Sequence, residues 1–348
     1  MAILTRYVDV DAAAGGNGTT NGLTGATCAY KSLSIWEAAQ QQDLTNGGGD
    51  IAECICESNG GSHTADTTAC TVDGFTTAVG SYIWIHASAG ARHAGVWSDS
   101  KYRLYVANAV ALTIRDDHVR VDGPQIGKSA TNANNQHAVY VTVQAAGSAT
   151  WLSNLILRHT GTYRQCGIYN ADVDSTIYIW NVIDYGHPGV DSLYDASVGI
   201  EGGTVYIYSS TLLGGRSGIN RLGGTVTAKN CYASELGAGT AYEGTITLTT
   251  CASSDTSGSA GLQNIAVNTT NFTNVTAGSE DFHLPAGSAL LDVGTDTSGD
   301  GAPLNFMTDI DGETIVAPRD VGADWRAAAG GGLSIPVARP YTQAVNRA

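Results

Sequence analysis

The stretch TIYIWNVI, residues 176–183, alternates aliphatic and aromatic side chains with period two and then turns at Asn181. Strict alternation is typical of a β-strand, in which successive side chains point to opposite faces. Asn, Gly and Ser favour tight turns. The stretch therefore predicts a short strand that ends in a turn.

The same pattern recurs along much of the chain. Related segments are HVRVDG (118–123), TWLSNLI (150–156), TVYIYS (204–209), TVTAKNC (225–231) and TITLTTC (245–251). When Gly123, Asn154, Asn181, Ser209, Asn230 and Thr250 are taken as equivalent, successive repeats lie 31, 27, 28, 21 and 20 residues apart. A second short element, Gly-Ile, precedes the longer strand at 167–168, 199–200 and 218–219.

Repeats of this kind cannot bury their own inward faces, so they must stack. The chain is therefore expected to be an all-β, right-handed parallel β-helix, with two or three short strands per coil and about 4.8 Å between coils. We expect Asn154, Asn181 and Asn230 to line up, each amide bonding the next.

Both ends of such a stack need covering, because an exposed sheet edge invites further pairing. Leu33, Trp36 and Ala39/Gln40 lie at helical spacing behind Ser32 and Ser34, either of which could cap a helix. We expect this helix to plug the first coil. The expected regions are an N-terminal strand and capping helix (1–48), coils (49–270), an irregular closing segment (271–326), and a flexible hinge with a docking tail (327–348).

Composition excludes several classes of function. The 348 residues carry a formal net charge of −15, which weighs against nucleic acid and anionic membranes as partners. No stretch reaches the length of a transmembrane helix, and the N-terminus lacks a secretory pattern, so we expect synthesis in the cytoplasm. The seven cysteines are expected to be buried free thiols, although a Cys231–Cys251 bridge stays open.

Two terminal signatures make the resemblance more specific. The opening YVDVD (7–11) with GGNGT (15–19), and the ending with DFHL (281–284), LDVG (291–294), DIDG (309–312) and RDVGA (319–323), resemble the ends of pectate-lyase-like right-handed parallel β-helix proteins. Such chains are common in bacterial surface proteins and tailed-phage particles. The resemblance covers nearly the whole chain, but it implies the fold and not one activity, because the fold hosts lyases, hydrolases, adhesins and inert spikes.

Candidate catalytic groups are acidic side chains near arginines. A pair of carboxylates could act as acid and base on a glycosidic bond. Alternatively, carboxylates could hold calcium while an arginine removes a proton, as the resembling lyases imply. The candidates are Asp172, Asp174, Asp184, Asp191, Glu201 and Arg216. Because the acids do not recur at one coil position, we interpret them as solvated loop charges and assign no catalytic residue and no cofactor, with calcium left open.

The eight histidines show no metal-ligand spacing, and most are expected on turns or at the surface. They are His63, His86, His93, His118, His137, His159, His187 and His283.

Two other features suggest binding. If Ile177, Ile179, Val205 and Ile207 point inward, then Tyr178, Trp180, Tyr206 and Tyr208 form an outward aromatic strip, suited to a sugar or to a neighbouring subunit. Behind the hinge Gly330–Gly332 lies an apolar, cationic tail that is either a frayed terminus or a docking peptide. Its candidate contact residues are Leu333, Ile335, Val337, Arg339, Tyr341 and Arg347.

These features favour a non-catalytic structural protein of a particle surface. The expected form is a phage virion decoration, head-fibre or spike protein on the virion surface, anchored by its tail to other virion or surface proteins. A homotrimer and a glycan partner stay open. The alternative is a polysaccharide depolymerase, either a lyase or a glycoside hydrolase, or a glycan-binding receptor module of tailspike type.

Overall fold

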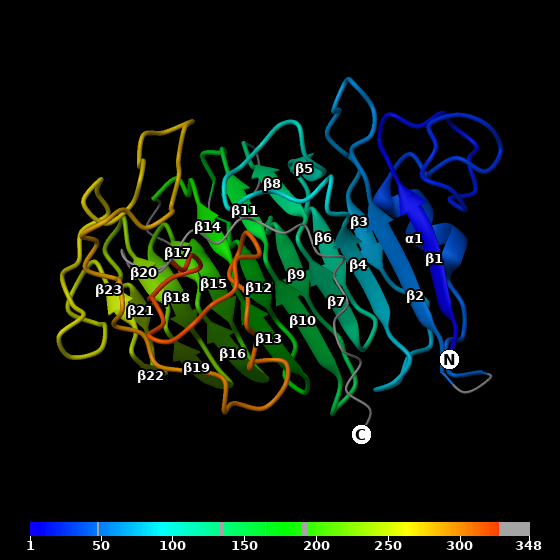
Figure 1. Cartoon of the computed structure of the whole chain (residues 1–348). Coiled ribbons are helices and arrows are strands. Elements are labelled where there is room, and N and C mark those ends of the chain that lie inside the picture. Colours follow the sequence, from blue (N-terminus) through cyan, green and yellow to red (C-terminus); the bar gives the residue numbers. More distant parts are fainter. Residues whose placement is uncertain (47–48, 132–135, 164, 190–193, 327–348) are drawn as a thin grey trace.

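The computed structural model describes residues 1–46, 49–131, 136–163, 165–189 and 194–326. Three parallel sheets run along the molecule, and successive coils of the chain add one strand to each sheet (Figure 1). This is the right-handed parallel β-helix that the repeats predict.

The three sheets differ in length. The first contains β1 (Ile3–Val8), β2 (Ile51–Cys56), β4 (Ile83–Ala87), β7 (Val119–Asp122), β10 (Ala149–Ser153), β13 (Thr176–Trp180), β16 (Thr204–Tyr208), β19 (Thr225–Lys229) and β22 (Thr247–Thr249). The second contains β5 (Arg103–Ala107), β8 (Gln125–Ser129), β11 (Ile156–His159), β14 (Ile183–Tyr185), β17 (Thr211–Leu213), β20 (Tyr232–Ser234) and β23 (Ala252–Ser253). The third contains β3 (Cys70–Val72), β6 (Leu112–Ile114), β9 (Val139–Val141), β12 (Ile168–Asn170), β15 (Ala196–Ile200), β18 (Ser217–Arg221) and β21 (Tyr242–Glu243).

The repeated segments pair in the expected register. Thr176 of β13 lies beside Thr204 of β16, and Trp180 lies beside Tyr208. The predicted turn residues, from Gly123 to Thr250, all have positive φ between 41° and 84°. One residue in the left-handed region, which Gly and Asn tolerate best, thus turns each of these six coils from the first sheet into the second.

The expected asparagine ladder is only partly correct. Asn181 Nδ2 donates to Asn154 Oδ1 at 3.0 Å, and Asn154 in turn donates to Asp122. The ladder stops at Ser209, which has no amide side chain. Asn230 instead bonds the closing segment, donating to the Thr295 carbonyl at 2.7 Å and accepting its N–H at 2.8 Å.

Most of the lumen of the β-helix is filled by one apolar core. Ile177, Ile179, Val205 and Ile207 all point inward and are at most 1% exposed, as the alternation predicts. These side chains belong to one cluster that runs from Val8 in β1 to Cys251 beside the last coil. All seven cysteines are buried and unpaired, which confirms the expected free thiols.

The predicted helix α1 (Leu33–Gln40) plugs the first coil. Ser32 caps it by accepting the Ile35 N–H at 3.2 Å, and Trp36 is fully buried and stacks on Phe75. The expectation for Ala39 is wrong: it is exposed, and Glu37 is buried in its place. No helix in the described part of the chain is long and apolar enough to cross a membrane.

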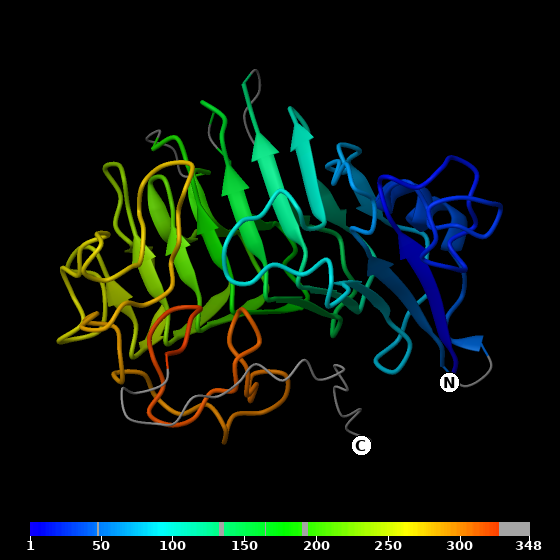
Figure 2. The same ribbon diagram turned by 45° about the horizontal axis from the view of Figure 1, so that its top comes forward.

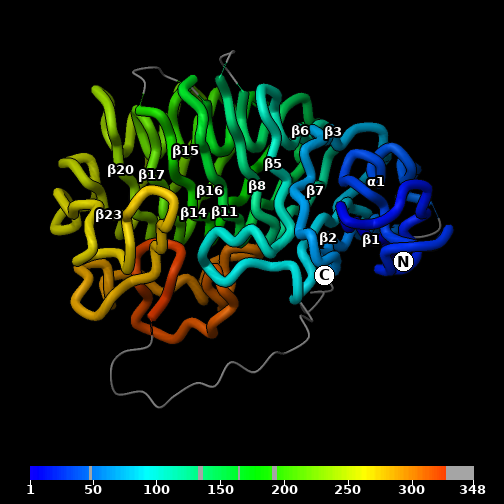
Figure 3. The backbone as a smooth tube through the Cα atoms, turned by 90° about the horizontal axis from the view of Figure 1, so that it is seen from above, coloured from blue at the N-terminus to red at the C-terminus, as the bar shows by residue number. Residues whose placement is uncertain are grey.

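The closing segment lies along the side of the β-helix (Figures 2 and 3). The last strand ends at Ser253, before the expected boundary at 270. Phe272, Phe282 and Leu290 pack against the outer face of the second sheet, where they contact residues such as Ile183 and Tyr232. The tail, with Leu333, Ile335, Val337, Arg339, Tyr341 and Arg347, lies outside the described residues.

Candidate functional site

A group of charged side chains lies inside the lumen, at the corner between the second and third sheets. Asp184, in the middle of β14, points inward because its neighbours Ile183 and Tyr185 pack outward against the closing segment. β11 and β14 pair so that Asp184 lies beside Leu157, whose side chain faces the lumen. His159 follows Leu157 by two residues in β11, so its side chain faces the lumen too. An aspartate therefore occupies a position that the two adjacent coils fill with Leu157 and Leu212.

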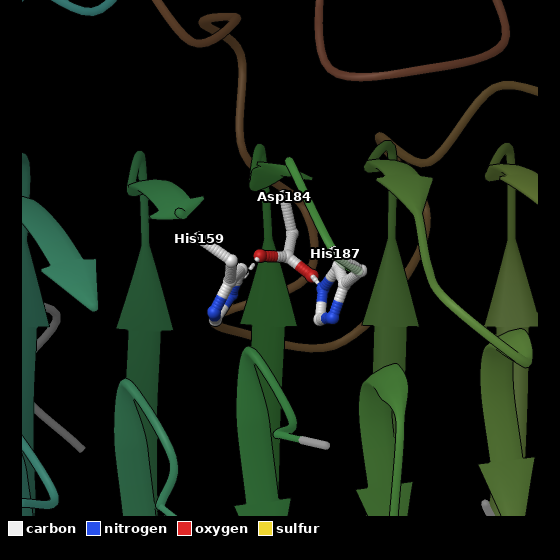
Figure 4. A group of neighbouring side chains, drawn as sticks. All are labelled: His159, Asp184 and His187. Carbon is white, nitrogen blue, oxygen red and sulfur yellow. Dashed lines mark hydrogen bonds and ion pairs between the residues drawn. The ribbon is translucent and has the colours of Figure 1, made fainter. Parts of the chain in front are cut away.

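One carboxylate holds two imidazole rings (Figure 4). His159 Nε2 lies 2.8 Å from Asp184 Oδ1, and His187 Nε2 lies 2.7 Å from Asp184 Oδ2. On its other side, His187 Nδ1 lies 3.3 Å from Asp195 Oδ1. All four side chains are 0% exposed. The ring centroids lie 4.1 Å apart with planes at 31°, so the two imidazoles face each other.

Burial and charge give the two histidines opposite protonation states. Burial alone would lower the pKa of His187, but Asp184 and Asp195 raise it to about 10. Burial and the charge of His187 lower the pKa of His159 despite the nearby carboxylate. Burial disfavours the ionised carboxylate of Asp184, yet both histidines together lower its pKa. The cluster is thus a buried ion pair of His187 and Asp184, with a neutral His159 donating to the same carboxylate.

The surroundings of the cluster are polar and tightly packed. Lys128, aligned with His159 on the preceding coil, is also buried and bonds Gln136 Oε1 at 3.1 Å, and burial lowers its pKa to about 8. Two glycines leave space for the carboxylates of Asp184 and Asp195. A Cβ at Gly167 would lie 2.6 Å from the Asp184 carboxyl carbon, and one at Gly215 would lie 2.0 Å from Asp195 Oδ2.

The predicted catalytic candidates do not form one surface group. The Asp172 carboxylate is buried and accepts hydrogen bonds from the backbone N–H groups of Gln144, Asp174 and Ser175. Burial raises the pKa of Asp172, but these bonds and the Ser175 side chain lower it by more, so the net shift is downward. The Asp174 and Glu201 side chains are exposed, and Asp191 lies outside the described residues. Arg216 forms a bidentate pair with Glu243, at 2.7 and 3.0 Å. Asp184, expected as a solvated loop charge, instead faces the lumen.

The aromatic strip points outward as predicted, but the structure covers half of it. Trp180 and Tyr208 are buried beneath Leu304 and Phe306 of the closing segment, so their expected exposure is wrong. Tyr178 and Tyr206 are partly exposed and stack on each other, with centroids 5.4 Å apart and planes at 10°. A sugar platform needs an open ring face, and here each ring uses one face on the other.

Three further residues extend this outward row along the first sheet. Trp84, Arg120 and Trp151 precede Tyr178 in the strand register. The Arg120 guanidinium lies 3.6 Å from the Tyr82 ring centroid and 3.7 Å from that of Trp151, between the two rings. These contacts stabilise neighbouring coils through ring stacking and cation–π attraction.

A second charged group lies in the closing segment. His283 Nδ1 lies 2.5 Å from Asp281 Oδ1, and its Nε2 lies 3.3 Å from Asp311 Oδ2. Burial raises the pKa of Asp324 to about 7 and, together with the contact to Asp311, that of Asp309 to about 10. The side chains of His283 and Asp281 are both 27% exposed, so this group is partly open to solvent.

The expectation that most histidines lie on turns or at the surface is wrong. His93, His137, His159 and His187 are buried. His159 and His187 are 28 residues apart, which is close to the length of one coil in this part of the chain. This spacing could have predicted that the two side chains lie on adjacent coils. Metal-ligand spacing within a few residues cannot detect such a pair, because its members lie on successive coils.

The fold and the site together define a parallel β-helix whose charged cluster lies inside the lumen. Among solved structures, the chain is similar to the crystal structure of pectate lyase Pel9A, with 13% identity and a TM-score of 0.41 over 94% of this chain and 97% of that chain. No protein-family model matches the sequence, and no curated protein matches it. A likeness at this level carries no inference about activity.

Proposed function

We propose that this chain is a non-catalytic structural protein of a particle surface, such as a phage virion decoration, head-fibre or spike protein. The proposal rests on one observation: candidate catalytic side chains form bonds that hold the coils together. Asp172 caps backbone N–H groups, Asp184 binds two histidines inside the lumen, and Arg216 is paired with Glu243.

These contacts weigh against a depolymerase. A general acid or base must reach the proton that it transfers, and the Asp184 side chain is 0% exposed. Two small hollows in the described chain are lined by other residues. One is lined by turn residues such as Asn181 and by the closing segment, and the other by apolar lumen residues such as Ile85. Neither hollow is lined by a candidate acid.

The outer surface suits a rigid structural rod better than a carbohydrate-binding surface. The first sheet aligns nine strands in one parallel stack, and its outward side chains contact each other from coil to coil. A stack joined both in the lumen and on its surface is stiff. In this proposal residues 333–348 attach the β-helix to another protein of the particle.

The test compares the full chain with a version that ends at residue 332, in the particle that carries the protein. Circular dichroism checks that the shorter chain is folded. The proposal expects the full chain to be incorporated and the shortened, folded chain to be absent from particles; normal incorporation of the shortened chain would refute the anchor.

A separate assay tests the absence of catalysis. The full chain is incubated with a panel of acidic and neutral polysaccharides, and new reducing ends and unsaturated uronates are measured. The proposal expects none above the buffer control. Product that disappears in Glu201→Gln would establish the depolymerase alternative, and binding without cleavage would establish the receptor module.

A further inference from the structure

The two ends of the β-helix differ in how they are covered. At the first coil, α1 plugs the lumen with the fully buried Trp36. At the other end of the first sheet lies β22, whose lumen-facing neighbours Ile246 and Leu248 pack against the core but are only partly buried (Figure 1). The equivalent side chains one coil earlier, Val226 and Ala228, are at most 1% exposed. The apolar core is therefore incompletely covered at its last coil.

The chain that follows the last strand covers the ends of the other two sheets. Ser253 of β23 donates its N–H to the Leu262 carbonyl and accepts the Ile265 N–H, both at 2.9 Å. Tyr242 of β21 donates its N–H to Ser257 Oγ at 3.0 Å. No described residue bonds the backbone of β22 across its outer edge in this way.

The backbone groups on the outer edge of β22 belong to residues that face the lumen. Thr249 accepts the Asn230 N–H at 3.0 Å, so its backbone turns toward β19. Backbone groups change side from one residue to the next along a strand, so the N–H and C=O groups of Ile246 and Leu248 point to the outer edge. Such an edge, beside partly exposed apolar side chains, is a template for one further strand.

The tail has the pattern of that strand. In LSIPV, residues 333–337, apolar side chains alternate with Ser334 and Pro336, so Leu333, Ile335 and Val337 share one face. Pro336 has no N–H to donate, so it fits a strand only where that side of the backbone faces solvent.

Pro336 determines the direction in which this strand can pair. Within the stack, outward-facing residues such as Thr204 and Thr225 donate their N–H groups to the preceding coil, at 3.0 and 2.9 Å. A parallel strand with its apolar face inward would place Pro336 where such a donor is needed. In an antiparallel strand the lumen-facing residues bond β22 instead, and the nitrogen of Pro336 faces solvent.

The chain is held close to the edge that this strand would cover. Gly322 donates its N–H to the Asn230 carbonyl at 2.9 Å, and Asn230 lies beside Thr249 at the end of β22. The four steps from Gly322 to Arg326 span at most about 14 Å, and the seven steps from Arg326 to Leu333 span up to about 25 Å. The tail therefore reaches its own β22, at the end where an antiparallel strand must begin. Tethering favours this edge over that of a second copy.

We propose that residues 333–337 add to the outer edge of β22 in the same chain as an antiparallel strand, with Ile335 beside Leu248 and Val337 beside Ile246. The apolar face of this strand covers the last coil, as α1 covers the first. This goes beyond the anchor proposed above, for which residues 338–348 then remain available.

Amide hydrogen exchange of the isolated full chain tests this pairing. In the wild-type chain the amides of Ile246 and Leu248 should be protected, because they donate to the tail. Ile335→Asp places a carboxylate against the apolar core, so these two amides should exchange at least about tenfold faster. Ser334→Asp, on the outward face of the same strand, is the matched control and should leave their exchange unchanged.

The amides of β13, in the middle of the first sheet, report whether each variant is folded and should stay protected in all three chains. Equal exchange of Ile246 and Leu248 in the wild-type chain and in Ile335→Asp would overturn the proposal, and so would a Ser334→Asp variant that behaves like Ile335→Asp. Protection that disappears when the wild-type chain is diluted would assign the strand to a second copy and overturn the pairing within one chain. Because no particle is present, these outcomes are separate from the success or failure of the anchor.

Discussion

Asn181 connects two coils and the closing segment, so its replacement should loosen all three. Its φ is 52°, and its Nδ2 donates to Asn154 Oδ1 at 3.0 Å and to the Thr308 carbonyl at 2.8 Å. Alanine in the left-handed region costs about 1 kcal/mol. Each lost hydrogen bond costs about 0.5–1.5 kcal/mol. Asn181→Ala should therefore lower the free energy of unfolding by about 2–4 kcal/mol.

Two control variants separate these contributions. Asn181→Gly keeps the left-handed turn and loses only the two bonds, so it should destabilise by about 1–3 kcal/mol. Asn264, also left-handed with a φ of 58°, is exposed, so Asn264→Ala should show only the backbone penalty of about 1 kcal/mol.

Hydrogen exchange is the suitable assay, because a stack of coils can open locally. Amides of β13 and of residues 304–326 should exchange faster in Asn181→Ala, and urea midpoints should follow the same order. If Asn181→Ala is no worse than Asn264→Ala, the amide bonds contribute nothing. If Asn181→Ala equals Asn181→Gly, the left-handed turn is not the cause.

Three other perturbations test the lumen and the closing segment. Asp184→Asn should destabilise by about 3–5 kcal/mol because it breaks the buried ion pair with His187, which keeps only its longer contact to Asp195, at 3.3 Å. Asp174→Asn, at an exposed site, should change the free energy of unfolding in urea by less than about 0.5 kcal/mol. Ile179→Ala should cost about 2–5 kcal/mol through a cavity in the lumen, which differential scanning calorimetry would detect. Burial raises the pKa of Asp324 to about 7, so the folded state binds more protons than the unfolded state between about pH 4 and 7. The contribution of Asp324 to stability should therefore fall as pH rises through that window. In a pH series, the urea midpoint of Asp324→Asn should fall less steeply than that of the wild-type chain.

The sequence alone was sufficient for the fold. Alternation in TIYIWNVI and its relatives is a local property of a strand, and a left-handed residue such as Asn181 ends each one. These features need no knowledge of distant contacts, so the inward aliphatics, the outward aromatics and the turn positions were all predictable. The plug helix was predictable for the same reason, since Ser32 and Trp36 lie within a few residues of each other.

The candidate site depended on tertiary structure. His159, Asp184 and His187 meet because they lie on adjacent coils, and coil lengths between 20 and 31 residues hide which positions align. The burial of Trp180 under Phe306 likewise followed from where the closing segment packs, which no local pattern encodes. Local alternation determined which way each side chain faces, and only the register between coils determined which side chain it meets.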